Sequence, residues 1–198
     1  SMLREQADPL VSLLGMRRSA TLIAVLSLLT LTACGGGGGG KCAEEIWTGE
    51  FGICLNAGWE QVSDEQLREE GVPIETLAAF QLKERRAGQR DNIVVSYERL
   101  GSKASSLKYS EVNIKTIEAT PEYKLIEKRE IEVDGEDSLL HVFTARPVPD
   151  LPARHFYQVS ATKGTTGYVF TGTLPFAVEA EIEEGLINML LSGSLEKK

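Results

Sequence analysis

Residues 123–146, with the sequence YKLIEKREIEVDGEDSLLHVFTAR, carry the pattern that decides the expected fold. Two strand-like runs, Tyr123–Val133 and Ser138–Arg146, flank the pair Asp134-Gly135. An Asp-Gly pair favours a tight hairpin, because both central positions of such a turn take positive φ. The segment therefore predicts two antiparallel strands, the first of which carries charged side chains on its outer face.

Further strands are predicted on both sides of this hairpin. Asn92–Leu100 is one of them, because Ile93, Val95 and Tyr97 recur at every second position and fall on one face. The other predicted strands are Ile46–Thr48, Phe51–Leu55, Thr76–Arg85, His155–Lys163 and Tyr168–Thr173.

Three helices are expected between and after the strands. Ser63 and Gln66 have the spacing of a capping box, which predicts a short helix. Ser106–Ala119 and Phe176–Ser192 carry the helical period. The side chains expected on one side are Leu107, Glu111, Ile114 and Ile117 in the first, and Val178, Ile182, Leu186 and Met189 in the second. Helices that interrupt an antiparallel sheet must cover its faces, so the predicted class is α+β.

The order of elements resembles a known superfamily. Phe51-Gly52-Ile53-Cys54-Leu55 followed by Gly58-Trp59 is similar to the opening strand and "GW" turn of PsbP/Mog1-like proteins, over roughly Trp47 to Leu195. The resemblance implies an α/β/α sandwich around a central antiparallel sheet and no shared catalytic residues. Better-known members bind other proteins, namely photosystem II subunits and a small GTPase, but no binding motif of theirs maps onto this chain.

The N-terminal region has the layout of an export signal. Arg17 and Arg18 precede the apolar run Thr21–Leu31, which is about half the length that a membrane-spanning helix needs. Leu31-Thr32-Ala33-Cys34 resembles the lipobox of bacterial lipoproteins, in which the cysteine sulfur takes a diacylglyceryl group and the chain is cut before it. An ordinary signal peptide with an incidental cysteine is the alternative.

These signals divide the chain into three parts. Residues 1–33 are the expected signal peptide region, with Met16 as the expected true start. Residues 34–45 are the lipidated cysteine and a linker that contains the six glycines Gly35–Gly40, and residues 46–198 are one PsbP/Mog1-like domain. The protein is then expected to be exported and anchored by lipid, facing the periplasm or the cell exterior. Gly35 is not an aspartate, which favours the outer membrane where one exists.

The charge balance disfavours some partners. The chain has 21 Lys and Arg against 29 Asp and Glu. Residues 1–33 hold three arginines and two acidic residues, so the chain from Cys34 onward has 18 against 27, a net charge of −9. Such a chain is repelled by nucleic acid and anionic lipid surfaces, so no nucleic-acid partner is expected.

The three cysteines fit an oxidising compartment. If Cys34 takes lipid, Cys42 and Cys54 remain as a pair, and a disulfide between them is the expected state of an exported protein. Free buried thiols are the alternative. Two cysteines without a nearby histidine supply too few ligands for a metal site, and no cofactor is expected.

Few residues suggest catalysis. His141 and His155 are the only histidines, and each fits a structural or surface role better than a base or a ligand. Glu179, Glu181, Glu183 and Glu184 lie where a helix begins and complement its dipole, with a cation site as the alternative. The chain has neither a Gly-x-Ser-x-Gly elbow nor a His-Glu-x-x-His motif, so we expect no enzyme.

Aromatic residues are the candidates for a binding surface, with core packing as the alternative. They are Trp47, Trp59, Tyr97, Tyr157 and Tyr168. Pro147–Pro152 is the expected irregular rim beside them, because binding surfaces favour loops on rigid scaffolds.

The function expected from the sequence is that of a membrane-tethered envelope lipoprotein that acts as a non-catalytic interaction or assembly module on an envelope protein. A lipoprotein that binds a small molecule or a lipid is the first alternative. A hydrolase with a non-sequential site, using His141 or His155 as its base, is the second.

Overall fold

The computed structural model describes residues 42–84 and 91–197. The predicted signal peptide, the lipidation site Cys34 and the glycines Gly35–Gly40 lie outside the described residues. The elements in chain order are β1 (Cys42–Trp47), β2 (Gly52–Asn56), β3 (Trp59–Gln61), α1 (Asp64–Glu69), β4 (Thr76–Leu82), β5 (Asn92–Arg99), α2 (Ser106–Ile117), β6 (Lys124–Val133), β7 (Glu136–Ala145), β8 (Arg154–Lys163), β9 (Thr166–Leu174) and α3 (Ala180–Leu191).

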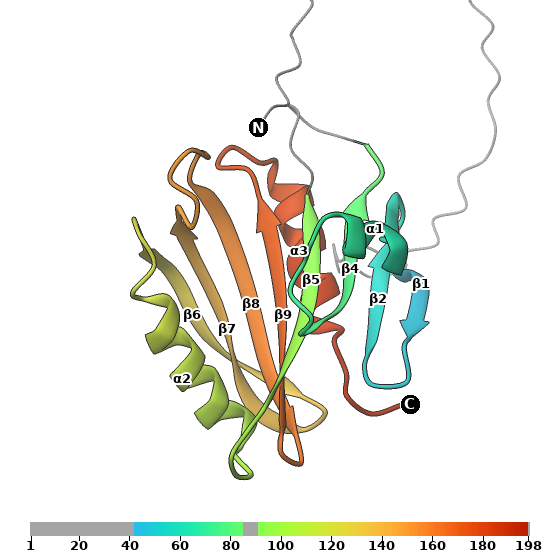
Figure 1. Ribbon diagram of the computed structural model, residues 1–198, viewed down its shortest axis with the longest axis vertical. Coiled ribbons are helices and arrows are strands. Elements are labelled where there is room, and N and C mark those ends of the chain that lie inside the picture. The colour runs from blue at the N-terminus through green and yellow to red at the C-terminus, as the bar shows by residue number, and fades with distance from the viewer. Residues whose placement is uncertain (1–41, 85–90, 198) are drawn as a thin grey trace, which may run out of the picture. The chain divides into compact units, whose positions relative to one another are not determined.

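Two antiparallel sheets form the scaffold (Figure 1). The larger has the order β3-β4-β5-β9-β8-β7-β6, and the smaller is the pair β1-β2. The hairpin predicted at Asp134-Gly135 is confirmed: Val133 pairs with Glu136, and Asp134 and Gly135 have φ of 51° and 80°. The pairing of β5 with β9 joins strands β3 to β5 to strands β6 to β9.

Helices cover both faces of the larger sheet. Gly167 and Gly172 lie five positions apart on β9, so they face opposite sides. A Cβ atom on Gly167 would clash with the ring of Tyr109 on α2, and one on Gly172 would lie 2.6 Å from Leu186 Cδ2 on α3. The chain therefore packs α2 on one face and α3 on the other, and the α+β class is confirmed.

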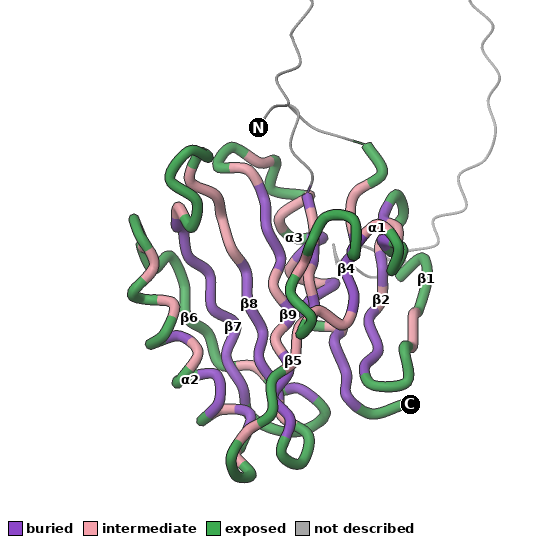
Figure 2. The backbone as a smooth tube through the Cα atoms, viewed as in Figure 1, coloured by how far each residue is buried: buried purple, intermediate pink, exposed green. Residues whose placement is uncertain are grey.

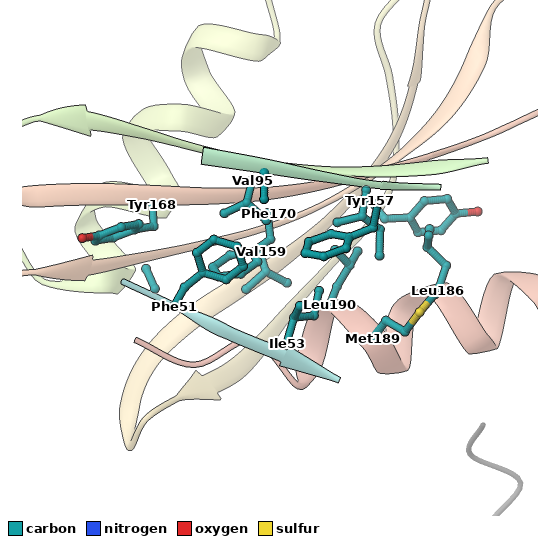
Figure 3. Close-up of a cluster of buried hydrophobic side chains, with 14 of the residues drawn as sticks. Phe51, Ile53, Val95, Tyr157, Val159, Tyr168, Phe170, Leu186, Met189 and Leu190 are labelled. Atoms are coloured by element: carbon teal, nitrogen blue, oxygen red, sulfur yellow. The ribbon is translucent and has the colours of Figure 1, made fainter. Parts of the chain in front are cut away.

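The main core lies between the sheet, α3 and β2 (Figure 3). Phe51, which directly precedes β2, is fully buried. Its ring contacts those of Phe170 and Phe80 edge-on, with 5.5 Å and 6.5 Å between the ring centroids. Leu186 and Met189 of α3 are buried in the same core, as their helical spacing predicts. Burial of apolar surface here stabilises the fold at about 25 cal/mol per Å².

The buried face of α2 differs from the predicted one. Its buried residues are Ser106, Tyr109, Ser110 and Ile114, and of the predicted set only Ile114 is among them. Ser110 Oγ lies 3.0 Å from Ser138 Oγ and donates a 3.2 Å hydrogen bond to the carbonyl of Ser160. The helix faces the sheet largely with hydroxyl groups, so the spacing of its apolar residues predicted the wrong buried face.

Two helix termini also correct the sequence analysis. The Ser63 hydroxyl accepts from the Gln66 amide at 3.2 Å as predicted, but Gln66 Nε2 donates to Glu70 instead of reaching back to Ser63. The last helix begins at Ala180 and not at Phe176. Phe176 instead lies against the ring of His155, with 5.0 Å between the ring centroids.

The first strand begins inside the predicted linker. β1 starts at Cys42, which pairs in register with Asn56 and is joined to Cys54 by a disulfide. The predicted disulfide is thus present, and it fixes residues 42–45 to β2. The linker predicted for residues 34–45 therefore extends at most to residue 41.

Candidate functional site

Three of the five aromatic candidates belong to the core. Trp59 and Tyr168 are each 7% exposed and Tyr157 is fully buried, so the prediction of a binding surface is wrong for these side chains (Figure 3). They fill the space between the sheet and the layer of α3 and β2, which gives their rings more apolar contact than a surface would. Tyr97 is half-buried against the core, and Trp47 is half-buried beside a groove.

The two histidines lie on opposite faces of the sheet. His141 pairs with Gln158 across β7 and β8, and Gln158 is three positions from His155 on β8. His141 is buried, stacks on Phe143 at 4.5 Å and has Nε2 3.0 Å from the Tyr123 hydroxyl. Burial, with a contribution from Lys128, lowers the pKa of His141 to about 4, so the ring is neutral at pH 7.

His155 belongs to a small polar cluster at the start of α3. Its Nδ1 lies 3.4 Å from the Tyr157 hydroxyl, which donates a 2.7 Å hydrogen bond to Glu183. Burial and this contact raise the pKa of Tyr157 above its ordinary range. One glutamate of the predicted acidic cluster thus holds a core tyrosine. Within residues 42–84 and 91–197, no three His, Cys, Asp or Glu side chains converge as metal ligands.

A groove of about 400 Å³ runs along the outer face of the β1-β2 pair. Trp47 pairs with Gly52 and Glu45 pairs with Cys54, so these residues share the face that points away from the core. The absence of a side chain at Gly52 lets the Trp47 ring pack on the backbone there, because a Cβ atom at this position would lie 2.9 Å from Cε3 of the ring. The lining residues are Glu45, Trp47, Gly52, Ile53, Cys54, Ser192, Ser194, Glu196 and Lys197.

The far wall of the groove is the segment that follows α3. It closes the free edge of β2, because the amide of Gly52 donates to the Ser194 carbonyl at 2.7 Å and the amide of Cys54 donates to Ser192 Oγ at 2.9 Å. Lys163 Nζ donates to the Leu195 carbonyl at 2.6 Å. The disulfide holds the other wall, so both sides of the groove are fixed.

Several exposed apolar side chains lie at one end of the larger sheet. We call Leu125, Ile126, Val148, Leu151 and Phe176 the apolar rim; each is between 48% and 64% exposed.

Strand register explains why the rim residues lie at the same end of the larger sheet. The pairs Lys124–Thr144, Ala145–Arg154 and His155–Leu174 close the strands at the same end, where the connections after β7 and β9 run side by side (Figure 1). The predicted loop Pro147–Pro152 supplies Val148 and Leu151. The sequence analysis missed the contribution of Phe176 because it placed this residue in a helix.

Burial differs between the strands of the larger sheet (Figure 2). β7 is buried along residues 138–145 and β8 along residues 157–161, whereas β6 is exposed along residues 124–130. Among the helices of the described ranges, none is long and apolar enough to cross a membrane.

No family model matches the sequence, and no curated protein does. Two of the solved structures that match this chain have TM-scores below 0.5. A crystal structure from Bacteroides thetaiotaomicron is 9% identical over 75% of this chain and 46% of its own, with a TM-score of 0.44. A protein of unknown function from Pseudomonas aeruginosa is 15% identical over 67% and 83%, with a TM-score of 0.45.

A third solved structure is more similar in fold. It is the solution structure of cyanobacterial PsbP (CyanoP) from Synechocystis sp. PCC 6803. The match covers 74% of this chain and 87% of that one at 14% identity, with a TM-score of 0.52. At this identity the likeness concerns the fold alone, and it shows that the chain has a PsbP-like fold.

Proposed function

We propose that this chain is a lipid-tethered protein of the bacterial cell envelope that docks on another protein and has no catalytic activity. The lipobox-like segment ending at Cys34 supports the tether, and the disulfide between Cys42 and Cys54 suits an exported protein. Seven residues separate Cys34 from β1. Such a length spans at most roughly 25–30 Å, which keeps the domain close to the membrane.

The apolar rim is the observation that carries the docking part of the proposal. Several half-exposed apolar side chains at one end of a sheet favour an interaction site, whereas singly scattered ones are ordinary. The rim side chains come from loops and strand ends that a seven-stranded sheet holds in place. Loops on a rigid scaffold are where proteins commonly bind their partners.

The described residues offer little for catalysis. The two histidines face opposite sides of the sheet and so do not act on one substrate together. His141 is buried and neutral, and the Tyr157 hydroxyl is committed to Glu183. These contacts support structural roles for the groups that a hydrolase would use.

In-cell crosslinking with matched variants tests the proposal. The double variant Leu151→Ser with Phe176→Ser removes rim surface, and Val112→Ser removes an equally exposed apolar side chain on α2. We expect one envelope protein to be captured by the parent chain and by Val112→Ser, and to be lost from the double variant. Equal capture by the double variant would refute docking through the rim.

The tether has its own test. The mature protein from its native host should weigh as much as the chain from Cys34 plus a diacylglyceryl group, and Cys34→Ala should lose that mass. An unmodified cysteine would refute the tether without affecting the test of the rim.

A further inference from the structure

The groove beside Trp47 differs from the apolar rim in its chemistry, because it combines an indole ring with carboxylates. We propose that this groove binds a basic side chain, arginine or lysine, presented by an extended segment of a partner protein. The proposal deepens the docking function above and rests on it for the origin of the segment. The groove itself is defined by described residues alone.

The shape of the groove suits one side chain. Trp47 and Glu45 lie on the outer face of β1, and Gly52 lets the indole ring lie close against the strand at one side of the groove. The volume of about 400 Å³ falls at the lower end of the range for small-ligand sites, roughly 300–1,000 Å³. A side chain with its flanking backbone fits such a space, and a folded surface does not enter it.

The charges favour a cation. Glu45 and Glu196 line the groove, and the ion pairs among the described residues involve neither of them. Lys197 is the one basic side chain in the lining, so the carboxylates outnumber it. A cation placed over an indole face is attracted by the ring quadrupole, most strongly when it is partly desolvated.

The hydroxyl groups of the groove are already engaged. Ser192 Oγ accepts from the Cys54 amide and donates to the Met189 carbonyl at 2.6 Å. Ser194 Oγ lies 2.6 Å from Asp134 Oδ1, to which it donates. The carboxylates and the indole face thus remain as the groups that select a ligand, which explains why a cation is preferred to a neutral polar group.

Backbone pairing also limits how a partner enters. The C-terminal segment occupies the free edge of β2, so an added strand cannot pair there. The disulfide fixes β1 against β2 on the other side. A partner segment therefore cannot pair with β2 in the groove and reaches it through a side chain.

The test uses the two tryptophans as matched reporters. In the ¹⁵N-labelled chain, Trp47 and Trp59 give separate indole resonances, assigned with Trp47→Phe; Trp59 is buried and serves as the internal reference. The probes are blocked Gly-Arg-Gly and Gly-Lys-Gly peptides, with Gly-citrulline-Gly as the neutral analogue of the first. We expect both basic peptides to shift the Trp47 resonance and leave Trp59 unchanged, and the citrulline peptide to have little effect.

Shape-conserving variants separate charge from folding. The double variant Glu45→Gln with Glu196→Gln should weaken binding of the arginine peptide at least about threefold, and Glu111→Gln on α2 should not change it. Trp47→Leu, followed through the backbone amide resonances of Glu45 and Gly52 because it lacks the indole reporter, should weaken binding by a similar factor or more.

Three results would overturn the proposal: equal shifts with arginine and citrulline, unchanged binding in the double glutamine variant, or no shift at the solubility limit of the basic peptides. Equal crosslinking by the parent chain and the rim double variant, with retained arginine binding, would refute docking through the rim and leave the groove intact. The failures of the two proposals are therefore distinguishable.

Discussion

The carboxylate of Asp134 accepts a 2.6 Å hydrogen bond from the hydroxyl of Ser194, a residue 60 positions further along the chain. Its other oxygen accepts from the Leu195 amide at 2.5 Å. Asp134 thus serves two purposes, because it also takes the positive φ of the β6-β7 turn. The turn that closes one hairpin also holds the far wall of the groove.

Asp134→Ala is expected to lower the free energy of unfolding by about 2–3 kcal/mol, because it removes an ionised acceptor of two hydrogen bonds and disfavours positive φ. Asp134→Asn keeps the turn and one acceptor, so its loss should be smaller. Urea denaturation measures both, and hydrogen exchange at residues 194–197 should accelerate in the alanine variant. Equal stability of both variants and the parent chain would contradict this role.

Reduction of the disulfide between Cys42 and Cys54 is expected to cost roughly 3 kcal/mol of stability, on the chain-entropy account of a short loop. Urea midpoints with and without reductant measure the loss. A variant with serine at both positions should have the same urea midpoint as the reduced parent, and reductant should not change that midpoint. If reductant leaves the parent's midpoint in place, the bridge contributes nothing to stability.

His141 should make stability depend on pH. Burial lowers its folded pKa to about 4 from the ordinary 6.5, so the unfolded chain binds the proton more readily. The contribution of neutral His141 to the free energy of unfolding is fully present above pH 6.5. It is lost as the pH falls from 6.5 towards 4, by about 3 kcal/mol in total. Urea denaturation across this range should show the slope in the parent chain and not in His141→Gln. A matched His155→Gln variant measures what the other histidine adds; an undiminished slope in His141→Gln would rule out His141 as its cause.

Gly172→Ala is expected to destabilise the fold by roughly 1–3 kcal/mol, because the new methyl group would press on Leu186 of α3. Gly101→Ala is the control, since nothing lies within 4 Å of the Cβ atom that it adds. Thermal unfolding of the two variants gives the comparison. Similar melting temperatures would mean that α3 does not approach β9 this closely.

The rim variants should lose a partner without losing stability. Leu151 and Phe176 are 55% and 64% exposed, so serine at these positions should change the free energy of unfolding by less than about 1 kcal/mol. Denaturation of the purified variants checks this before any crosslinking result is interpreted. A larger loss would show that the rim contributes to the fold.

Local chemistry made several features predictable from the sequence. Asp134-Gly135 specifies its turn, Ser63 caps its helix, and the pair Cys42 and Cys54 forms the expected bridge. Each of these depends on residues close together in the chain, so spacing alone carries the information.

Other features depend on contacts that spacing does not encode. Trp59 and Tyr157 are suitable for a surface or a core, and only the packing of α3 and β2 decides that they are buried. The groove was missed because its far wall, at Ser194, comes from the opposite end of the domain. The closest indication of the groove in the sequence was Gly52, which follows the predicted strand that contains Trp47.

The hydroxyl contacts beneath α2 set the specificity of its packing. Apolar surfaces tolerate sliding, whereas Ser110 meets both Ser138 and the Ser160 carbonyl in one orientation of the helix. A helix that rotated or slipped by one residue would leave these buried groups without partners, at about 1–3 kcal/mol each. The layer of hydroxyl groups between α2 and the sheet therefore fixes the position of the helix: it stabilises one register of α2 over the adjacent registers.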